Sequence, residues 1–275
     1  QSRHSIFNRY IKKIPFVFLQ HGVIALKRVD NFYGKGKKGG CDLFVVSTNK
    51  EKQTIVENFE YEPDEVINTG LPRWDVLKDK SQGKREILIM PTWRNWLDSV
   101  PDKDFEESDY FRHYMGLLNS ERLNQILEKY DLEVNFYLHA KFQEYADTFK
   151  SISKRIHLIS FGEVAVNEML MRCRMLITDY SSVCWDILYQ DKPSLFYQFD
   201  IEKYNEAHGS YIDMETELFG NRAATQEQLL DYLEETVQND FRLKPEYEKM
   251  RGEYLQFKDH EHSRHICEEI KKRFH

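Results

Sequence analysis

Four places in the chain put an imidazole, hydroxyl or guanidinium group directly after a short apolar run. These groups are His21, Thr92 with Arg94, His139, and the stretch that holds Thr178, Asp179, Ser181 and Ser182. In parallel α/β sheets the carboxyl ends of the strands lie at one edge, and ligands bind there. Backbone N–H groups at a helix start favour negative charge. The set therefore predicts a phosphate or diphosphate site with a histidine available as base.

Several other kinds of site are excluded by the motifs. The chain has no carboxylate pair of the glycosidase type and no G-x-S-x-G elbow. It has no Walker-type glycine loop, and Gly34-Lys-Gly36 follows no strand and lacks the third glycine of a dinucleotide site. With these motifs absent, phosphate binding is the function that best fits the polar residues after the apolar runs.

The elements that must position these groups alternate between strand and helix. We expect strands at residues 15–20, 42–47, 66–70, 86–90, 134–138, 155–159, 175–178 and 193–197, and helices at 49–59, 104–130, 164–172, 180–189 and from 225 onward. This rhythm predicts an α/β fold of two Rossmann-like units with parallel sheets facing a cleft. The first unit, 1–82, has few strands. A charged linker at 78–85 connects it to the second unit. The second is 83–275, and its last helix is a candidate to pack back on the first unit.

Composition narrows the class of protein and its partners. The 275 residues carry a net charge of −7 and are 41% hydrophobic, which suits a globular protein and not a nucleic-acid binder. Four separated cysteines indicate reduced cytoplasmic thiols, and no apolar run could span a membrane. We expect no signal peptide, and the abrupt start at Gln1 suggests a piece of something longer.

Two cationic segments each have an ordinary and a functional interpretation. Residues 1–14 combine basic and aromatic residues at helical spacing. They form either a surface helix or a face that lies on an anionic membrane. Residues 33–40 are rich in lysine and glycine, as in a solvated loop or in a mobile clamp on a polyanion.

The remaining histidines and tryptophans are given structural roles. The sequence predicts a solvated helix start around His260, His262 and His265, and no metal site. It predicts a packed or satisfied His157 and a surface His113. Core or interface positions are expected for the tryptophans, which are Trp93, Trp96 and Trp185.

Several stretches together resemble the CDP-glycerol glycerophosphotransferases, which build teichoic acids and related bacterial capsule polymers. They are Gln20-His21-Gly22 with Lys27, Gly70-Leu-Pro-Arg-Trp-Asp75, Pro91-Thr-Trp-Arg94, Leu138-His139, Leu176-Ile-Thr-Asp-Tyr-Ser-Ser182 with Asp186, and Gly209-Ser-Tyr-Ile-Asp213. The resemblance implies a GT-B fold of two Rossmann-like domains.

The resemblance also implies a role for each matching residue. His21 would take the proton of an acceptor hydroxyl, and His139 would contact the donor's phosphates with support from Arg94. Other residues would bind the diphosphate and nucleotide, namely Thr92, Thr178, Asp179, Ser181 and Ser182. Candidate contacts to acceptor or phosphate are Lys27, Arg73 and His208. The acceptor would attack the β-phosphorus of a CDP-polyol, glycerol above all, and CMP would leave; no cofactor is implied, and a divalent metal stays open.

The chain departs from the family pattern at several points. Ala140 stands where proline usually follows the second histidine, and His208 stands where arginine precedes the glycine. A proline-glycine stretch is missing near Leu218-Phe-Gly220. These departures leave open the polyol and donor binding through residue 208.

Three functions remain in competition. The first is a phosphopolyol transferase with a CDP-polyol donor and an anionic polymer or lipid-linked acceptor, cytoplasmic and peripheral on the inner face of the bacterial plasma membrane. The second is a GT-B glycosyltransferase that uses a nucleotide sugar. The third is a non-catalytic homologue that binds polymer.

Overall fold

The computed structural model describes residues 14–274, and the expected N-terminal basic segment falls almost wholly outside them. The chain forms two compact units. Of the described residues, unit 1 holds those up to Val76 together with those from Gly252 on, and unit 2 is Leu77–Arg251. The sequence predicts the boundary after residue 82 and counts the last helix with the second unit, as a candidate to pack back on the first. In the structure residues 77–82 belong to unit 2, where Lys80 donates its backbone N–H to Met171.

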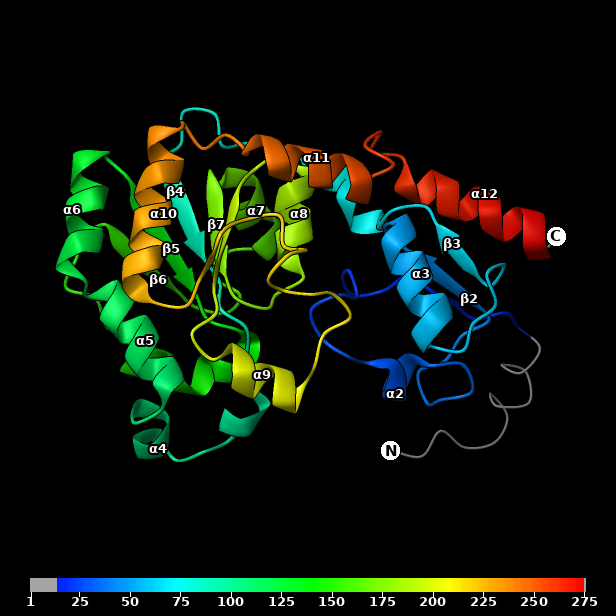
Figure 1. Cartoon of the computed structure of the whole chain (residues 1–275), viewed down its shortest axis with the longest axis horizontal. Helices are drawn as coiled ribbons and strands as arrows, with labels where there is room; N and C mark the ends of the chain where they lie inside the picture. Colours follow the sequence, from blue (N-terminus) through cyan, green and yellow to red (C-terminus); the bar gives the residue numbers. More distant parts are fainter. Residues whose placement is uncertain (1–13, 275) are drawn as a thin grey trace. The chain divides into compact units, whose positions relative to one another are not determined.

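Unit 1 is a three-stranded parallel sheet with helices on its faces (Figure 1). Its strands, in the order β1-β2-β3, are β1 (Val17–Phe18), β2 (Leu43–Val46) and β3 (Val66–Asn68). Its helices are α2 (Asp30–Tyr33), α3 (Asn49–Asn58), the 3-10 helix η1 (Pro72–Val76) and α12 (His262–Phe274). The predicted first strand is shorter than expected, because the backbone of Gln20 turns to φ 64°.

The last helix packs on the sheet of unit 1. Ile266 of α12 lies in one buried cluster with Leu43, Val45 and Ile67. Asp75 fixes the start of the helix, since its Oδ1 accepts the backbone N–H of His262 at 2.7 Å and its Oδ2 that of Ser263 at 2.9 Å. A side-chain acceptor at this position satisfies N–H groups that have no partner inside the helix.

One prediction about this helix is wrong. His262 was expected at a solvated helix start, but its side chain is fully buried, and its Nδ1 lies 2.9 Å from the carbonyl oxygen of Thr69. Room for the ring comes from Gly70, where a Cβ would lie 2.1 Å from His262 Nδ1 and where φ is +76°. The stretch from Gly70 to Asp75 therefore holds α12 in place.

Unit 2 is a doubly wound parallel sheet (Figure 1). The strands, in the order β6-β5-β4-β7-β8-β9, are β4 (Glu86–Ile89), β5 (Glu133–Tyr137), β6 (Ile156–Ile159), β7 (Met175–Thr178), β8 (Ser194–Tyr197) and β9 (Arg222–Ala223). The helices are α4 (Asp102–Glu106), α5 (Asp109–Leu118), α6 (Glu121–Lys129), α7 (Val166–Arg172), α8 (Val183–Tyr189), α9 (Ile201–Ala207) and α10 (Gln226–Gln238), with the 3-10 helices η2 (Asn95–Leu97) and η3 (Ala140–Thr148). Helix α11 (Pro245–Tyr254) begins in unit 2, and its residues from Gly252 on belong to unit 1.

The expected strands of this unit are confirmed, and its helices differ in detail. The helical region expected at 104–130 is three helices, because Ser108 and Ser120 cap new helix starts. The helix expected from residue 180 begins at Val183. The short elements α9 and β9 were not predicted, because seven and two residues give too little periodicity to recognise.

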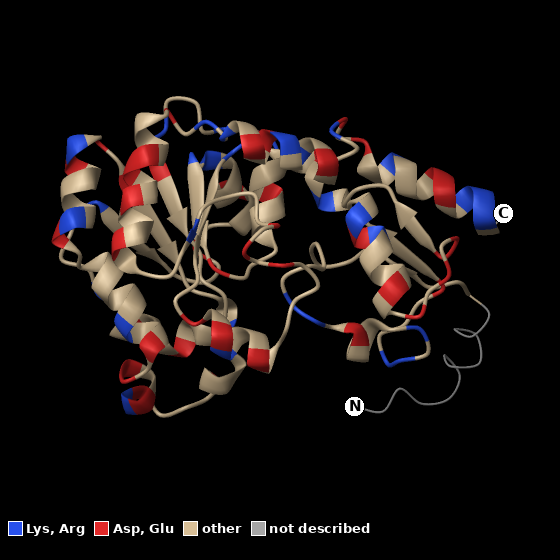
Figure 2. Cartoon of the chain, viewed as in Figure 1, with Lys and Arg blue, Asp and Glu red and all other residues tan. Residues whose placement is uncertain are grey.

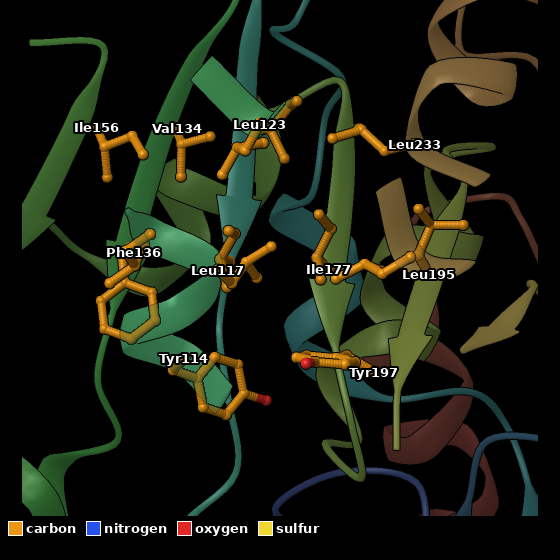
Figure 3. Packing of buried hydrophobic residues seen from close by; sticks show 14 of the residues in the cluster. Tyr114, Leu117, Leu123, Val134, Phe136, Ile156, Ile177, Leu195, Tyr197 and Leu233 are labelled. Carbon is orange, nitrogen blue, oxygen red and sulfur yellow. The ribbon is translucent and has the colours of Figure 1, made fainter. Parts of the chain in front are cut away.

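The core of unit 2 lies between the sheet and α5, α6 and α10. Figure 3 shows two pairs of side chains from neighbouring strands, Ile156 beside Val134 and Ile177 beside Leu195. Leu117, Leu123 and Leu233 of the three helices belong to the same buried cluster. Trp185 is fully buried on the opposite side, in α8, as a core position requires. Trp93 and Trp96 are partly buried against the main cluster.

Lys, Arg, Asp and Glu residues alternate along most of the described elements (Figure 2). The clearest basic group is the last turn of α12, which carries Lys271, Lys272 and Arg273. Cations at a helix C-terminus are favoured by the helix dipole. Within residues 14–274, no helix is long and apolar enough to cross a membrane.

Candidate functional site

The strand order of unit 2 marks one edge as the place for a ligand. β4 pairs with β5 on one side and with β7 on the other, so the chain reverses its direction of winding between β4 and β7. Ligands of doubly wound sheets bind at the carboxyl ends of the strands at such a switch point. Thr92 and Arg94 follow β4 there, residues 179–182 follow β7, and His139 follows β5 next to them.

Asp179 joins the two strand ends at this switch point. Its side chain is fully buried, and its Oδ1 accepts the backbone N–H of Thr92 at 2.8 Å and of Tyr180 at 2.7 Å. Its Oδ2 lies 2.8 Å from Arg94 Nη2 and 3.2 Å from the Tyr114 hydroxyl. A buried carboxylate with four donors is well satisfied, so Asp179 fixes the backbone that a ligand would meet.

Arg94 is part of the same buried network and not of the exposed surface. Its Nε lies 2.7 Å from Asp200 Oδ2 and its Nη2 3.1 Å from Asp200 Oδ1, while Nη1 donates to the carbonyl of Thr92 at 2.7 Å. Burial alone would lower the pKa of Arg94, but Asp179 and Asp200 outweigh burial and hold that pKa well above its ordinary value. The guanidinium is therefore permanently charged inside the fold.

Three of the residues predicted to bind the donor have their side chains turned into the fold in this structure. Arg94 and Asp179 are fully buried and bonded to each other, and Thr178 is 1% exposed and donates its hydroxyl to the carbonyl of Met90 at 2.6 Å. Side chains so engaged hold the strand ends together. They are positioning residues of the edge.

Two hydroxyl groups, of Ser181 and Ser182, are better placed for direct contact, and a third, of Thr92, lacks a hydrogen-bond partner within residues 14–274. Ser181 and Ser182 are partly exposed, and the Ser182 side chain makes no capping hydrogen bond to α8. Thr92 is partly exposed, although its Oγ1 atom is buried and has no hydrogen-bond partner among the described residues. Because buried hydroxyls normally have a partner, Thr92 is a candidate ligand contact.

His139 is held in one orientation at the start of η3. Its Nδ1 accepts the backbone N–H of Lys141 at 3.1 Å, and its ring stacks on Trp93 with 6.4 Å between centroids. In a neutral imidazole an accepting Nδ1 leaves the proton on Nε2. In this tautomer Nε2 carries an N–H, which is the kind of donor that a phosphate oxygen accepts from. Lys141 adds a cation 4.9 Å from the Trp93 ring.

His208 lies in a second cationic and aromatic group near the same edge. It ends α9, and its ring centroid is 6.1 Å from that of Trp96 and 4.9 Å from that of Tyr204. Lys203 lies 5.1 Å from the Trp96 ring. The predicted contact of His208 with phosphate stays a prediction.

The predicted residues of unit 1 surround the loop after β1. His21 is exposed, and its carbonyl accepts a hydrogen bond from Arg73. Arg73 was predicted to contact acceptor or phosphate, and in this structure it also holds the loop. Lys27 is partly buried, and burial lowers the pKa of its ammonium group.

His157, His113 and His265 can be compared with the roles that the sequence predicts for them. His157 is exposed on β6 and lies 3.3 Å from Glu133, so it is satisfied but not packed. His113 stacks on Phe199 with 4.0 Å between centroids. Asp259, Glu261 and His265 bring possible metal ligands within 4.8 Å of one another, but His265 already pairs with Asp259 at 2.7 Å. We assign no ion to them.

Two residues that hold the site residues in place, Asp200 and Glu51, were not predicted from the sequence. Asp200 follows β8 by three positions, so the same search for polar residues after apolar runs could have found it. Glu51 stands three positions after Thr48, as in a capping box, and its full burial has no signature in the sequence. The aromatic walls around Arg94, Tyr180 at 4.8 Å and Tyr204 at 5.7 Å, depend on the tertiary fold.

Comparison with known proteins decides the family. Residues 3–272 match the family described as CDP-Glycerol:Poly(glycerophosphate) glycerophosphotransferase. The chain belongs to this family. The resemblance seen in the sequence is thereby confirmed over nearly the whole chain.

Two relatives of this chain have names that refer to teichoic acid synthesis. The chain is 30% identical over 270 residues to the minor teichoic acid biosynthesis protein GgaB of Bacillus subtilis, covering 92% of this chain and 29% of GgaB. It is 26% identical over 254 residues to the teichoic acid glycerol-phosphate transferase of Staphylococcus aureus, covering 83% of this chain and 60% of the relative. The chain thus spans less than two thirds of the length of either.

A solved structure confirms the fold class. The wall teichoic acid polymerase TagF matches with a TM-score of 0.66 at 19% identity, covering 93% of this chain and 68% of that chain. The family member is a mixed α/β protein with parallel sheets, of the GT-B type, as the sequence predicted.

Proposed function

We propose that this chain transfers a phosphopolyol from a CDP-activated donor to a hydroxyl group of a teichoic acid or capsule-like polymer and releases CMP. The observation that carries the proposal is the switch-point edge of unit 2. There the Nε2 of His139 and the hydroxyls of Thr92, Ser181 and Ser182 follow neighbouring strands in a chain of this family. Glycerol phosphate is the proposed group, because the family is described by that substrate.

The donor side of the reaction is assigned to unit 2. His139 donates from Nε2 to a phosphate oxygen, and Ser181 and Ser182 offer hydroxyl and backbone donors beside it. Arg94 and Asp179 act beneath them by holding the two strand ends in register, since both are buried. Preorganised donors at developing negative charge are the main source of catalysis in phosphoryl transfer.

The acceptor side is assigned to His21 of unit 1. Its imidazole takes the proton from the attacking hydroxyl. The hydroxyl oxygen forms a bond to the β-phosphorus, and the bond from that phosphorus to the bridging oxygen breaks. CMP leaves with the bridging oxygen, so atoms and charge balance without a covalent enzyme intermediate. No resident cofactor enters this scheme, and an assay with and without a chelator tests whether a divalent metal does.

The chain is also proposed to work at the inner face of the bacterial plasma membrane, as a peripheral protein. The support is its proposed acceptor, a growing anionic polymer or its lipid-linked precursor. Sedimentation with anionic vesicles, compared for the whole chain and for a variant with the basic residues at 1–14 replaced, tests this part by itself.

A donor screen tests the proposed function. Thermal shift and calorimetry are measured with CDP-glycerol, CDP-ribitol and UDP-sugars, because relatives of the chain include ribitol-phosphate polymerases by name. We expect saturable binding of a CDP-polyol that His139→Ala weakens. Preference for a UDP-sugar would favour a glycosyltransferase, and polymer binding without any donor binding would favour a non-catalytic role.

A further inference from the structure

We infer that Glu51 is a positioning residue for His21, because it holds the loop that carries this histidine from inside unit 1. The inference rests on the proposed function in that His21 is taken as the base. Glu51 lies in the first turn of α3, and its side chain is 3% exposed. An ionisable side chain that is almost fully buried needs partners, and those of Glu51 come from two different segments.

The first set of partners lies at the end of β2. Glu51 Oε2 accepts the backbone N–H of Ser47 at 2.7 Å and the Ser47 hydroxyl at 2.6 Å. The backbone N–H of Glu51 itself donates to Thr48 Oγ1 at 2.9 Å. These bonds fix the carboxylate to the start of α3, where the helix dipole also favours a negative charge.

The second partner lies in the His21 loop. Glu51 Oε1 accepts the backbone N–H of Ile24 at 2.6 Å, three residues after His21. On the other side of His21, Gln20 donates its Nε2 to the carbonyl of Val45 at 2.5 Å. The loop is therefore tied to β2 and α3 both before and after the histidine.

The backbone beside His21 shows why such ties are needed. Gln20 has φ 64°, a conformation that costs a residue with a side chain about 1 kcal/mol or more. Such a conformation persists only where the surroundings impose it. Glu51 and Val45 supply those surroundings, so the direction in which the exposed His21 ring leaves the sheet depends on them.

A carboxylate suits this position better than an amide. Its two oxygens accept from donors on two segments, whereas an amide offers one acceptor oxygen and places an NH2 group against a backbone N–H. Glu51→Gln therefore keeps the volume and breaks one of the two connections. Glu57→Gln is the matched control, because Glu57 is exposed on the same helix and accepts only from Gln53 Nε2 at 2.7 Å among the bonds seen here.

Two measurements on the whole chain test the inference. In hydrogen exchange, Glu51→Gln is expected to lower the protection of residues 19–27 about tenfold while β4 and β7 keep theirs. In turnover with a CDP-polyol and a polymer acceptor, kcat is expected to fall about 10- to 100-fold with the donor dissociation constant changed less than about twofold. Glu57→Gln should change neither. Ser47→Ala, which removes one donor, should show a smaller effect in the same direction if Glu51→Gln does not fold.

The failure of this inference is distinct from failure of the proposed function. Unchanged protection of residues 19–27 in Glu51→Gln, or an equal loss over all of unit 1, would overturn the positioning role. A fall in kcat matched by an equal weakening of donor binding would do so as well. If no donor is turned over at all, the proposed function fails, and the exchange measurement still decides whether Glu51 holds the loop.

Discussion

Arg94 and Asp179 form a buried ion pair, with 2.8 Å between Nη2 and Oδ2 and no exposed surface on either side chain. Asp200 adds a second carboxylate to the same guanidinium at 2.7 Å. Strand ends far apart in the sequence are thus joined by one cation. The positions of the site residues around Arg94 therefore depend on this network of ion pairs.

Replacing Arg94 with an uncharged residue should therefore destabilise the fold strongly. Arg94→Met leaves Asp179 and Asp200 buried without their partner, and we expect the free energy of unfolding to fall by about 3–5 kcal/mol. Denaturant unfolding of the chain measures this fall. The control is Arg112→Met, which removes an exposed ion pair to Asp109 and should cost no more than about 0.5 kcal/mol. Equal stabilities for the two variants would contradict the structural role of Arg94.

Alanine substitutions at Gly70 and Gly83 together test how closely α12 packs against Gly70. Both have positive φ, +76° and +72°, but only at Gly70 would a Cβ meet another atom, His262 Nδ1 at 2.1 Å. Gly83→Ala should cost about 1 kcal/mol from the backbone alone. Gly70→Ala should cost about 2 kcal/mol more, because the buried ring must move. Thermal unfolding compares them, and similar losses would show that the ring is not packed as described.

His139 should matter for turnover and little for folding. His139→Asn keeps a side-chain acceptor for the backbone N–H of Lys141 but removes the Nε2 donor. We expect kcat to fall about 10²- to 10³-fold, as when one preorganised donor to developing charge is lost. The free energy of unfolding should stay within about 0.5 kcal/mol, as it should in the exposed control His157→Asn. Full activity in His139→Asn would remove this residue from the donor site.

Glu51 gives the stability of the chain a pH dependence of known sign. Burial raises the pKa of Glu51 above its ordinary value, against hydrogen bonds from Ile24, Ser47 and Gln20 that lower it. The folded state then keeps the proton at pH values where the unfolded state has lost it. Stability should therefore fall as the pH rises from the ordinary carboxyl range through the raised pKa. Unfolding at several pH values, compared with Glu51→Gln, should show this slope only in the wild type.

The sequence predicts the strands of unit 2 well because each is a short apolar run that ends in a polar residue. β7, followed by Asp179, is an example, and its four residues are all buried. The same pattern indicates that the residues after β4, β5 and β7 share an edge. Helix starts were less well predicted, since Tyr180 to Ser182 form a turn before α8 where a helix was expected.

What the pattern could not show is which polar residues turn inward. Arg94 and Ser182 both follow apolar runs, yet Arg94 is fully buried and Ser182 is partly exposed. The difference depends on Asp200, more than a hundred residues beyond Arg94, and on the rings that surround the guanidinium. His262 is a similar case, because its burial depends on Gly70 from the opposite part of the sequence.

The most direct test is the identity of the nucleotide released. The whole chain is incubated with CDP-glycerol or CDP-ribitol and a teichoic-type oligomer, and the products are separated by chromatography. We predict CMP in equal amount to the phosphopolyol added to the oligomer, with turnover lost in His21→Ala although that variant still folds and binds donor. Release of a nucleoside diphosphate from a sugar donor, or CMP formation that His21→Ala leaves unchanged, would contradict the account.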